Sequence, residues 1–79
     1  MSRVEVNINL ILEELNLTKN RLAVEAKLRP NLMTEITTSE VKSIRFTTLI
    51  KLLDAINKIS EEQGGRFYNV ADILHYTKQ

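Results

Sequence analysis

Apolar residues in the middle of the chain recur with the period of an α-helix. Thr18 stands before the first apolar stripe and is a residue type that caps helices well. Pro30 opens the second stripe, where its fixed φ suits the first helical position and its missing N–H costs nothing. We expect a turn around Lys27 and Leu28 between these segments. The predicted helices span residues 18–26, 30–37 and 46–62, with a polar linker over 37–43.

The two ends of the chain are also predicted to be helical. Ser2 and Glu5 have the spacing of a capping box, and apolar residues follow at helical intervals. Asn69 and Asp72 have the same spacing near the C-terminus. The two added helices span residues 3–15 and 70–77. Because no segment is recognised with the two-residue period of a strand, the expected fold is all-α: one domain over residues 1–79, a compact bundle of five short helices.

Helical spacing also predicts which side chains form the core. The aromatic residues Phe67, Tyr68 and Tyr76 are expected to pack on the first and fourth helices, with a dimer surface as the alternative. The aliphatic and other apolar residues expected inside are Val4, Ile8, Ile11, Leu12, Leu15, Leu22, Ala23, Ala26, Met33, Ile36, Phe46, Leu49, Ile50, Leu52, Leu53, Ile56, Ile59, Val70, Ile73 and Leu74.

Composition excludes several kinds of chemistry. The 79 residues include no cysteine and one histidine, His75, so disulfides and thiolate metal sites are excluded and no metal or cofactor is expected. The sequence has no nucleophile–base pair and no glycine-rich phosphate loop, so we do not expect an enzyme or a small-molecule substrate. No apolar run reaches the roughly 18 residues that cross a membrane, and no signal-peptide pattern is present, which predicts a cytoplasmic protein.

Positive charge is concentrated in the middle of the chain. The formal net charge is +1, yet residues 18–51 carry seven lysines and arginines against three glutamates. A local excess of this kind is the electrostatic pattern of a surface that binds nucleic acid. An ordinary solvated surface is the alternative interpretation.

The residues from Thr18 to Ile36 follow the pattern T-x-x-x-L-A-x-x-A-x-L-x-x-x-x-M-x-x-I. This pattern resembles the helix-turn-helix of phage repressor and Cro proteins, which belong to the xenobiotic-response-element-like transcriptional regulators. Residues 43–57 are similar to the helix that follows the reading helix in short, single-domain members, and residues 72–76 resemble their closing D-[IL]-L-x-Y signature. The segment 58–69 looks like an insertion relative to those members.

The resemblance implies a lambda-repressor-like DNA-binding domain with its helix-turn-helix at about residues 18–37. In this family the first turns of the reading helix reach base edges, while the linker and neighbouring helix ends hold phosphates. Asn31 is the strongest candidate reader, because its amide can pair with adenine N6 and N7 together. The implied base-contacting residues are Arg29, Pro30, Asn31, Thr34 and Glu35. The implied backbone-contacting residues are Thr18, Lys19, Thr38, Lys42, Ser43 and Arg45.

The implied function is that of a sequence-specific regulator, a repressor from a phage or mobile element, that binds double-stranded DNA as a homodimer. The chain departs from the family at two places: Lys27 replaces the usual turn glycine, and Thr38-Ser39 replaces Asn-Gly. Leu32 is expected on the exposed side of the reading helix, facing either a thymine methyl or a partner protein. These features favour an alternative function, a protein-interaction module such as an antirepressor that binds a protein partner.

Overall fold

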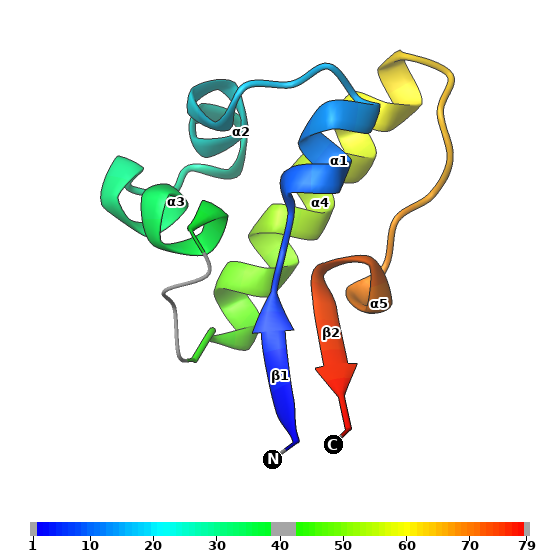
Figure 1. The fold of residues 1–79 in the computed structure, drawn as a ribbon. Coiled ribbons are helices and arrows are strands. Elements are labelled where there is room, and N and C mark those ends of the chain that lie inside the picture. Colours follow the sequence, from blue (N-terminus) through cyan, green and yellow to red (C-terminus); the bar gives the residue numbers. More distant parts are fainter. Residues whose placement is uncertain (1, 39–42, 79) are drawn as a thin grey trace.

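The computed structural model describes residues 2–38 and 43–78, which contain five helices and one two-stranded antiparallel sheet (Figure 1). In chain order the elements are β1 (Arg3–Val6), α1 (Asn9–Glu14), α2 (Lys19–Ala26), α3 (Pro30–Thr37), α4 (Phe46–Glu62), α5 (Val70–Ile73) and β2 (Leu74–Thr77). The other elements pack on the long helix α4. In Figure 1, α1 and the sheet lie in front of α4, and α2 and α3 lie to its left.

The core forms where the inner faces of the other elements meet α4. Leu52 and Ile56 of α4 are fully buried, together with Leu22 of α2, Ile36 of α3 and Ile8 just before α1. The inward positions predicted for α2 and α3 are confirmed, since Leu22, Ala23, Ala26, Met33 and Ile36 are all buried. Packing of these faces on one long helix removes enough apolar surface from water to hold short helices that would not persist alone.

Local sequence signals set the bounds of the central helices. The structure confirms α3 over residues 30–37 and α4 over residues 46–62, with Pro30 as the first residue of α3. The Thr18 hydroxyl caps α2 by accepting a hydrogen bond from the Arg21 N–H at 3.2 Å. These caps act within one turn of the chain, so they form wherever the helix forms.

The predicted helix over residues 3–15 is wrong in its first part. Residues 3–6 form strand β1, and α1 begins only at Asn9, where the N–H of that residue donates to Asn7 Oδ1 at 3.0 Å. The Ser2–Glu5 capping box is therefore absent, and Glu5 instead forms an ion pair with Arg3 at 2.9 Å.

The predicted helix over residues 70–77 is likewise half correct. Asn69 and Asp72 do form a capping box, in which Asp72 Oδ2 accepts from the Asn69 N–H at 2.9 Å. The helix ends at Ile73, however, and residues 74–77 become strand β2, paired antiparallel with β1. The all-α expectation is wrong for this reason: a pairing between the two ends of the chain overrides the local helical pattern.

The two-stranded sheet has an apolar face and a polar face. Val4 lies opposite Tyr76 and Val6 opposite Leu74 in the strand register, so all four share one face. Val6 is buried and Leu74 half-buried, whereas Val4 and Tyr76 are 62% and 66% exposed. The expectation that Val4 and Tyr76 lie in the core is therefore wrong, because the outer half of the sheet extends beyond the helices, where both termini lie (Figure 1).

Five further burial predictions are wrong. Phe46, Ile50, Phe67 and Val70 were expected to pack inward, but they are 81%, 55%, 74% and 45% exposed. Leu32 was expected on the surface, but it is half-buried and packs against the core. Tyr68 follows its prediction: it is 3% exposed, and it contacts α1 and α4 through its hydroxyl and its backbone.

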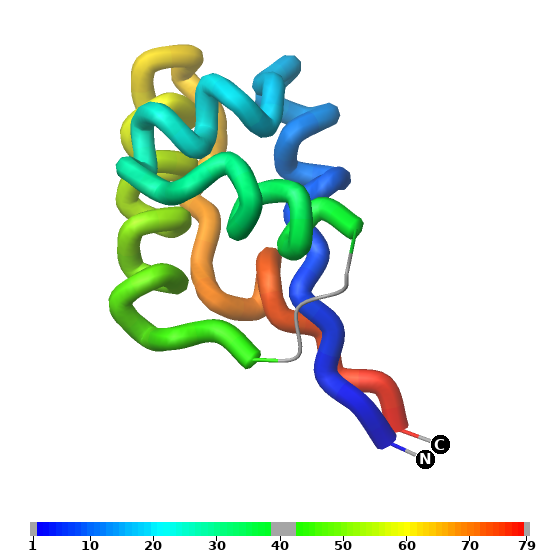
Figure 2. The backbone as a smooth tube through the Cα atoms, turned by 90° about the vertical axis from the view of Figure 1, so that its left-hand side faces the viewer, coloured from blue at the N-terminus to red at the C-terminus, as the bar shows by residue number. Residues whose placement is uncertain are grey.

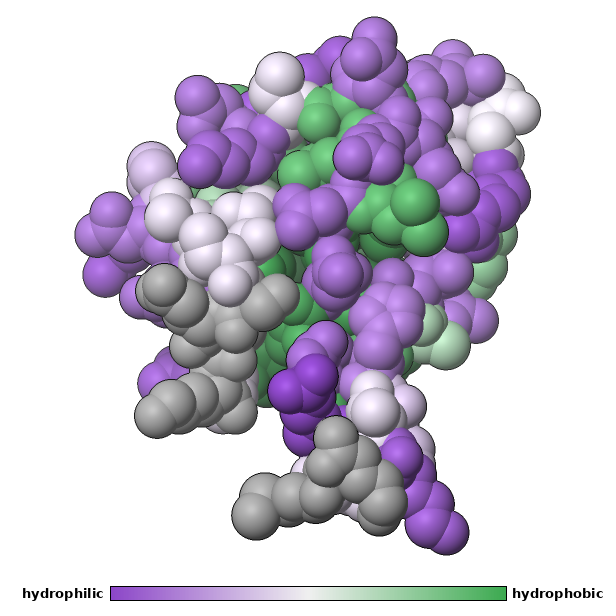
Figure 3. Space-filling model, viewed as in Figure 1, coloured by the Kyte–Doolittle hydropathy of each residue, from purple (hydrophilic) through white to green (hydrophobic). Residues whose placement is uncertain are grey.

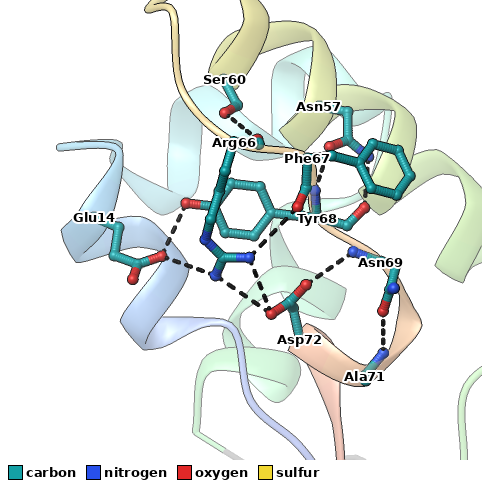
Figure 4. Close-up of polar contacts among 9 residues, drawn as sticks. All are labelled: Glu14, Asn57, Ser60, Arg66, Phe67, Tyr68, Asn69, Ala71 and Asp72. Atoms are coloured by element: carbon teal, nitrogen blue, oxygen red, sulfur yellow. Dashed lines mark hydrogen bonds and ion pairs between the residues drawn. The ribbon is translucent and has the colours of Figure 1, made fainter.

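Polar contacts hold the segment between α4 and α5 (Figure 4). The Arg66 guanidinium lies 3.3 Å from both Glu14 and Asp72 and stacks on the Tyr68 ring at 3.9 Å. The Tyr68 hydroxyl donates to Glu14 at 2.8 Å, and Ser60 Oγ donates to the Arg66 carbonyl at 2.6 Å. Through these contacts one arginine ties α1, this segment and α5 together.

Candidate nucleic-acid interface

An open groove separates α3 from the first turns of α4. Its volume is about 790 Å³. In Figure 2, α3 crosses the middle of the view and α4 rises along its left side. The lining residues are Lys27, Leu28, Arg29, Asn31, Leu32, Glu35, Ser43, Ile44, Arg45, Thr48 and Lys51. We call this feature the α3–α4 groove.

Four cationic side chains line the α3–α4 groove against one carboxylate. Lys27, Arg29, Arg45 and Lys51 are all exposed, and Glu35 is the acidic residue. Among residues 2–38 and 43–78, none of the four cations forms an ion pair; the ion pairs that do form lie elsewhere. Unpaired cations in a concave surface reinforce one another's field, so the groove attracts anions.

Two helices begin at the α3–α4 groove. Arg29 is the N-cap residue of α3 and Arg45 that of α4, and neither helix has a side-chain hydrogen bond that caps it. The first N–H groups of a helix carry a partial positive charge and lack partners within the helix. Because both cap residues line the groove, these helix ends add to the field of its side chains.

Lys27 produces the turn between α2 and α3 without a glycine. Its φ and ψ are 57° and 44°, the left-handed conformation that residues with a Cβ adopt at a cost. The Lys27 N–H donates to the Ala23 and Val24 carbonyls at the end of α2. The Leu28 N–H donates to the Ala23 carbonyl at 2.9 Å. This turn orients α3 so that its first residues line the groove.

The predicted base-contacting residues separate into two groups. Arg29, Asn31 and Glu35 line the α3–α4 groove, while Pro30 and Thr34 are exposed outside its lining. The Thr34 hydroxyl already donates to the Pro30 carbonyl at 3.1 Å, which leaves it only as an acceptor.

The predicted backbone-contacting residues also separate. Ser43 and Arg45 line the groove. Thr18 and Lys19 lie at the start of α2, outside the lining, and the Thr38 hydroxyl donates to the Thr34 carbonyl at 2.9 Å at the end of α3. Lys42 lies outside the described residues.

Sequence reasoning did not single out several residues of the lining. Lys51 and Thr48 are the most important, because they project from α4 beside Arg45. They are three residues apart and so share one side of the helix, a spacing that could have identified them. Leu28, Leu32 and Ile44 supply the apolar wall, and their position depends on the tertiary packing.

A second polar cluster lies away from the groove, around Arg66. Burial, followed by the hydrogen bond to Glu14, raises the pKa of Tyr68. The Asn69 N–H and then the Arg66 guanidinium hold the pKa of Asp72 below its usual range. Glu14 and Asp72 both accept hydrogen bonds from Arg66, so the cluster is internally satisfied and joins structural elements.

No family model, curated protein or solved structure matches this chain. Within the described ranges, no group of three or more His, Cys, Asp or Glu side chains is placed to hold a metal ion. No helix of residues 2–38 or 43–78 has both the length and the apolar character needed to cross a membrane.

Proposed function

We propose that the chain is a sequence-specific regulator that binds double-stranded DNA through a helix-turn-helix made of α2 and α3. The observation that carries the proposal is the α3–α4 groove, where four exposed cations and two helix N-termini converge. Phosphate contacts of this kind supply most of the affinity of DNA-binding proteins. In this arrangement a DNA strand follows the groove, and α3 lies in the adjacent major groove.

Asn31 and Arg29 are the proposed base readers. Both are exposed at the start of α3, Arg29 as its N-cap and Asn31 on its first turn, and both line the groove with Arg45. Asn31 suits adenine, and Arg29 suits guanine O6 and N7. Glu35 would repel a phosphate but can accept a hydrogen bond from cytosine N4. Its contribution to binding therefore depends on the DNA sequence. The proposed role is occupation of an operator by a repressor, as a homodimer on a two-fold site.

The salt dependence of binding tests the proposal. The probe is random-sequence duplex DNA, and the measurement is the binding constant at several salt concentrations. Each neutralised phosphate contributes about −0.9 to the log–log slope, so the three groove cations that are not assigned to a base, Lys27, Arg45 and Lys51, predict a slope of about −2.7 per chain. Lys51→Ala is expected to make the slope shallower by about 0.9.

Lys58→Ala is the matched control. Lys58 lies outside the groove lining and pairs with Glu25 at 3.7 Å, so its loss removes the same charge without a groove contact. The slope of this variant should equal that of the unmodified chain. Absence of binding at low salt, or equal effects of Lys51→Ala and Lys58→Ala, would contradict DNA binding through the groove.

A protein-interaction module on the same scaffold is the second candidate function. Leu28, Leu32 and Ile44 give the groove an apolar wall, and Glu35 places a carboxylate beside them. A mixed apolar and charged groove also suits a protein segment, such as part of a host or phage regulator. The double variant Asn31→Ala with Arg45→Ala separates the two: DNA binding is lost under the first proposal, whereas capture of a protein partner by the apolar wall persists under the second.

A further inference from the structure

One side of α4 carries an apolar stripe that is largely exposed in the described chain. Phe46, Ile50 and Leu53 follow one another at intervals of four and three residues, which places them on the same side of the helix. Phe46 is 81% and Ile50 55% exposed, and Leu53 is half-buried against the core. We call these residues, with Phe67, the α4 stripe.

Phe67 extends the α4 stripe at its far end. Asn57, one further turn along α4, hydrogen-bonds to both the N–H and the carbonyl of Tyr68. These bonds fix the position of Phe67, which directly precedes Tyr68. Phe67 and Asn57 line one shallow hollow together, and Figure 4 shows the Phe67 ring beside Asn57. Phe67 is 74% exposed. The stripe therefore has an aromatic side chain at each end and aliphatic side chains between them.

The α4 stripe and the α3–α4 groove lie on different sides of α4. At 3.6 residues per turn, Thr48 and Lys51, which line the groove, are about half a turn away from Phe46. A molecule on the stripe therefore leaves the groove open. The face shown in Figure 3 is largely hydrophilic, with apolar residues in separate patches.

We propose that a second copy of this chain packs on the α4 stripe, with the two α4 helices antiparallel about a two-fold axis. In that arrangement the Phe46 end of one stripe meets the Phe67 end of the other. At these exposures the two aromatic and two aliphatic side chains of the stripe expose roughly 450 Å² of surface per chain. Two copies bury twice that area, and a polar rim brings the total to about 1,000 Å², which is the lower limit for a specific interface.

The size of the chain favours the same occupant. Folding of 79 residues buries a smaller fraction of the surface than folding of a larger domain does, and self-association removes further apolar area from water. An exposed apolar area of this size matches the largest patch on a typical monomer, and such patches are often functional. A self-complementary stripe, aromatic at both ends, is suited to a two-fold interface.

Sedimentation equilibrium without DNA tests the interface. The double variant Phe46→Ser with Ile50→Ser is compared with Leu10→Ser with Val24→Ser. The control removes two side chains that are 65% and 77% exposed on other helices. The unmodified chain and the control are expected to dimerise equally. The stripe variant is expected to dimerise at least roughly thirtyfold more weakly, since each substitution acts twice in a two-fold interface.

A cross-linking experiment gives a second readout, which detects the dimer directly and does not depend on weakening it. The chain contains no cysteine, so Ile50→Cys introduces a single thiol near the proposed two-fold axis. Under mild oxidation it should form a disulfide dimer, and Val24→Cys should not. A chain that stays monomeric at its highest soluble concentration, or dimers that both double variants weaken equally, would overturn the interface. Because these measurements contain no DNA, their failure leaves the salt-dependence test of DNA binding unaffected.

Discussion

Asn57 and Tyr68 pair through two hydrogen bonds that imitate a strand pairing. Asn57 Nδ2 donates to the Tyr68 carbonyl at 2.9 Å, and the Tyr68 N–H donates to Asn57 Oδ1 at 2.7 Å. One side chain of α4 thus satisfies both backbone groups of a residue that is only 3% exposed. This pairing allows the segment after α4 to place an aromatic ring in the core without regular secondary structure.

Asn57→Ala is expected to destabilise the fold by about 2 kcal/mol, because two hydrogen bonds are lost and two backbone groups beside a buried residue are left unpaired. The measurement is the free energy of unfolding in urea. Asn20→Ala is the control: Asn20 is exposed on α2 and its side chain has no hydrogen bond among the described residues, so the change should be below about 0.5 kcal/mol. Equal losses in the two variants would contradict the assigned role of the pairing.

Lys27→Gly is expected to change stability and DNA affinity in opposite directions. Lys27 has a φ of 57°, which glycine adopts without steric cost, so the variant should gain about 0.5–1 kcal/mol in the free energy of unfolding. It also removes one groove cation, so DNA binding should weaken and the salt slope should become shallower by about 0.9. Both are measured on the same sample, by urea unfolding and by DNA titration.

Asn16→Gly is the control for the Lys27 substitution. Asn16 has a similar φ of 51°, but asparagine tolerates this conformation better than lysine, so the stability gain should be smaller. Asn16 does not line the groove, so DNA binding should not change. A larger gain for Asn16→Gly than for Lys27→Gly would contradict the conformational explanation.

Asp72→Asn is expected to make stability less dependent on pH in acid. The pKa of Asp72 is lowered by the Asn69 N–H and by Arg66, so the charged form stabilises the folded state. This contribution is present above the ordinary carboxylate pKa of about 4 and is lost as the pH falls through the lowered pKa. Asparagine can still accept the Asn69 N–H through its one oxygen, but its NH2 group then faces Arg66, so the variant removes the charge together with the hydrogen bonds from Arg66.

The expected result for Asp72→Asn is a lower free energy of unfolding at neutral pH and a difference from the unmodified chain that shrinks in acid. Urea unfolding at a series of pH values provides the measurement. Asp54→Asn is the control, because Asp54 is exposed and forms no ion pair within residues 2–38 and 43–78. A constant difference across the pH series would show that the Asp72 carboxylate does not stabilise the fold through its charge.

Asn31→Ala is expected to relax sequence preference without changing the salt slope. Loss of a bidentate contact to adenine costs about 1–3 kcal/mol at one base pair and nothing elsewhere. Selection of bound sequences from a random duplex library, before and after the substitution, measures this change. Arg45→Ala is the contrasting variant, because a phosphate contact should weaken binding to all sequences and reduce the slope. Identical selected sequences for Asn31→Ala and the unmodified chain would remove Asn31 as a base reader.

The central helices could be predicted because their signals are local. Thr18, Pro30 and the apolar intervals of α4 act within one or two turns, and the structure places α2, α3 and α4 at the predicted bounds to within one residue. Val4 and Tyr76 show the limit of this reasoning. Each fits a helical interval with a neighbour in sequence, but each is part of a strand whose partner is at the other end of the chain.

The groove could be predicted only in part for a related reason. Arg29, Asn31 and Arg45 were named because the family resemblance implies DNA contacts at their positions, and the structure brings them to one groove. Lys51 was counted only in the positive charge of residues 18–51, and Leu32 was expected to face either DNA or a partner protein. That both line one groove depends on the way α3 packs beside α4. Phe46 was assigned to the core because hydrophobicity alone does not distinguish a buried face from an exposed stripe.

The sequence by itself therefore determined the three central helices, their caps and the concentration of positive charge between residues 18 and 51. Each depends on interactions between neighbours in the chain, whose geometry the backbone sets. The tertiary structure alone decided the pairing of β1 with β2, the α3–α4 groove and the exposure of Phe46. These depend on which distant segments meet, and the free energy of such contacts comes from packing that no local window of sequence contains.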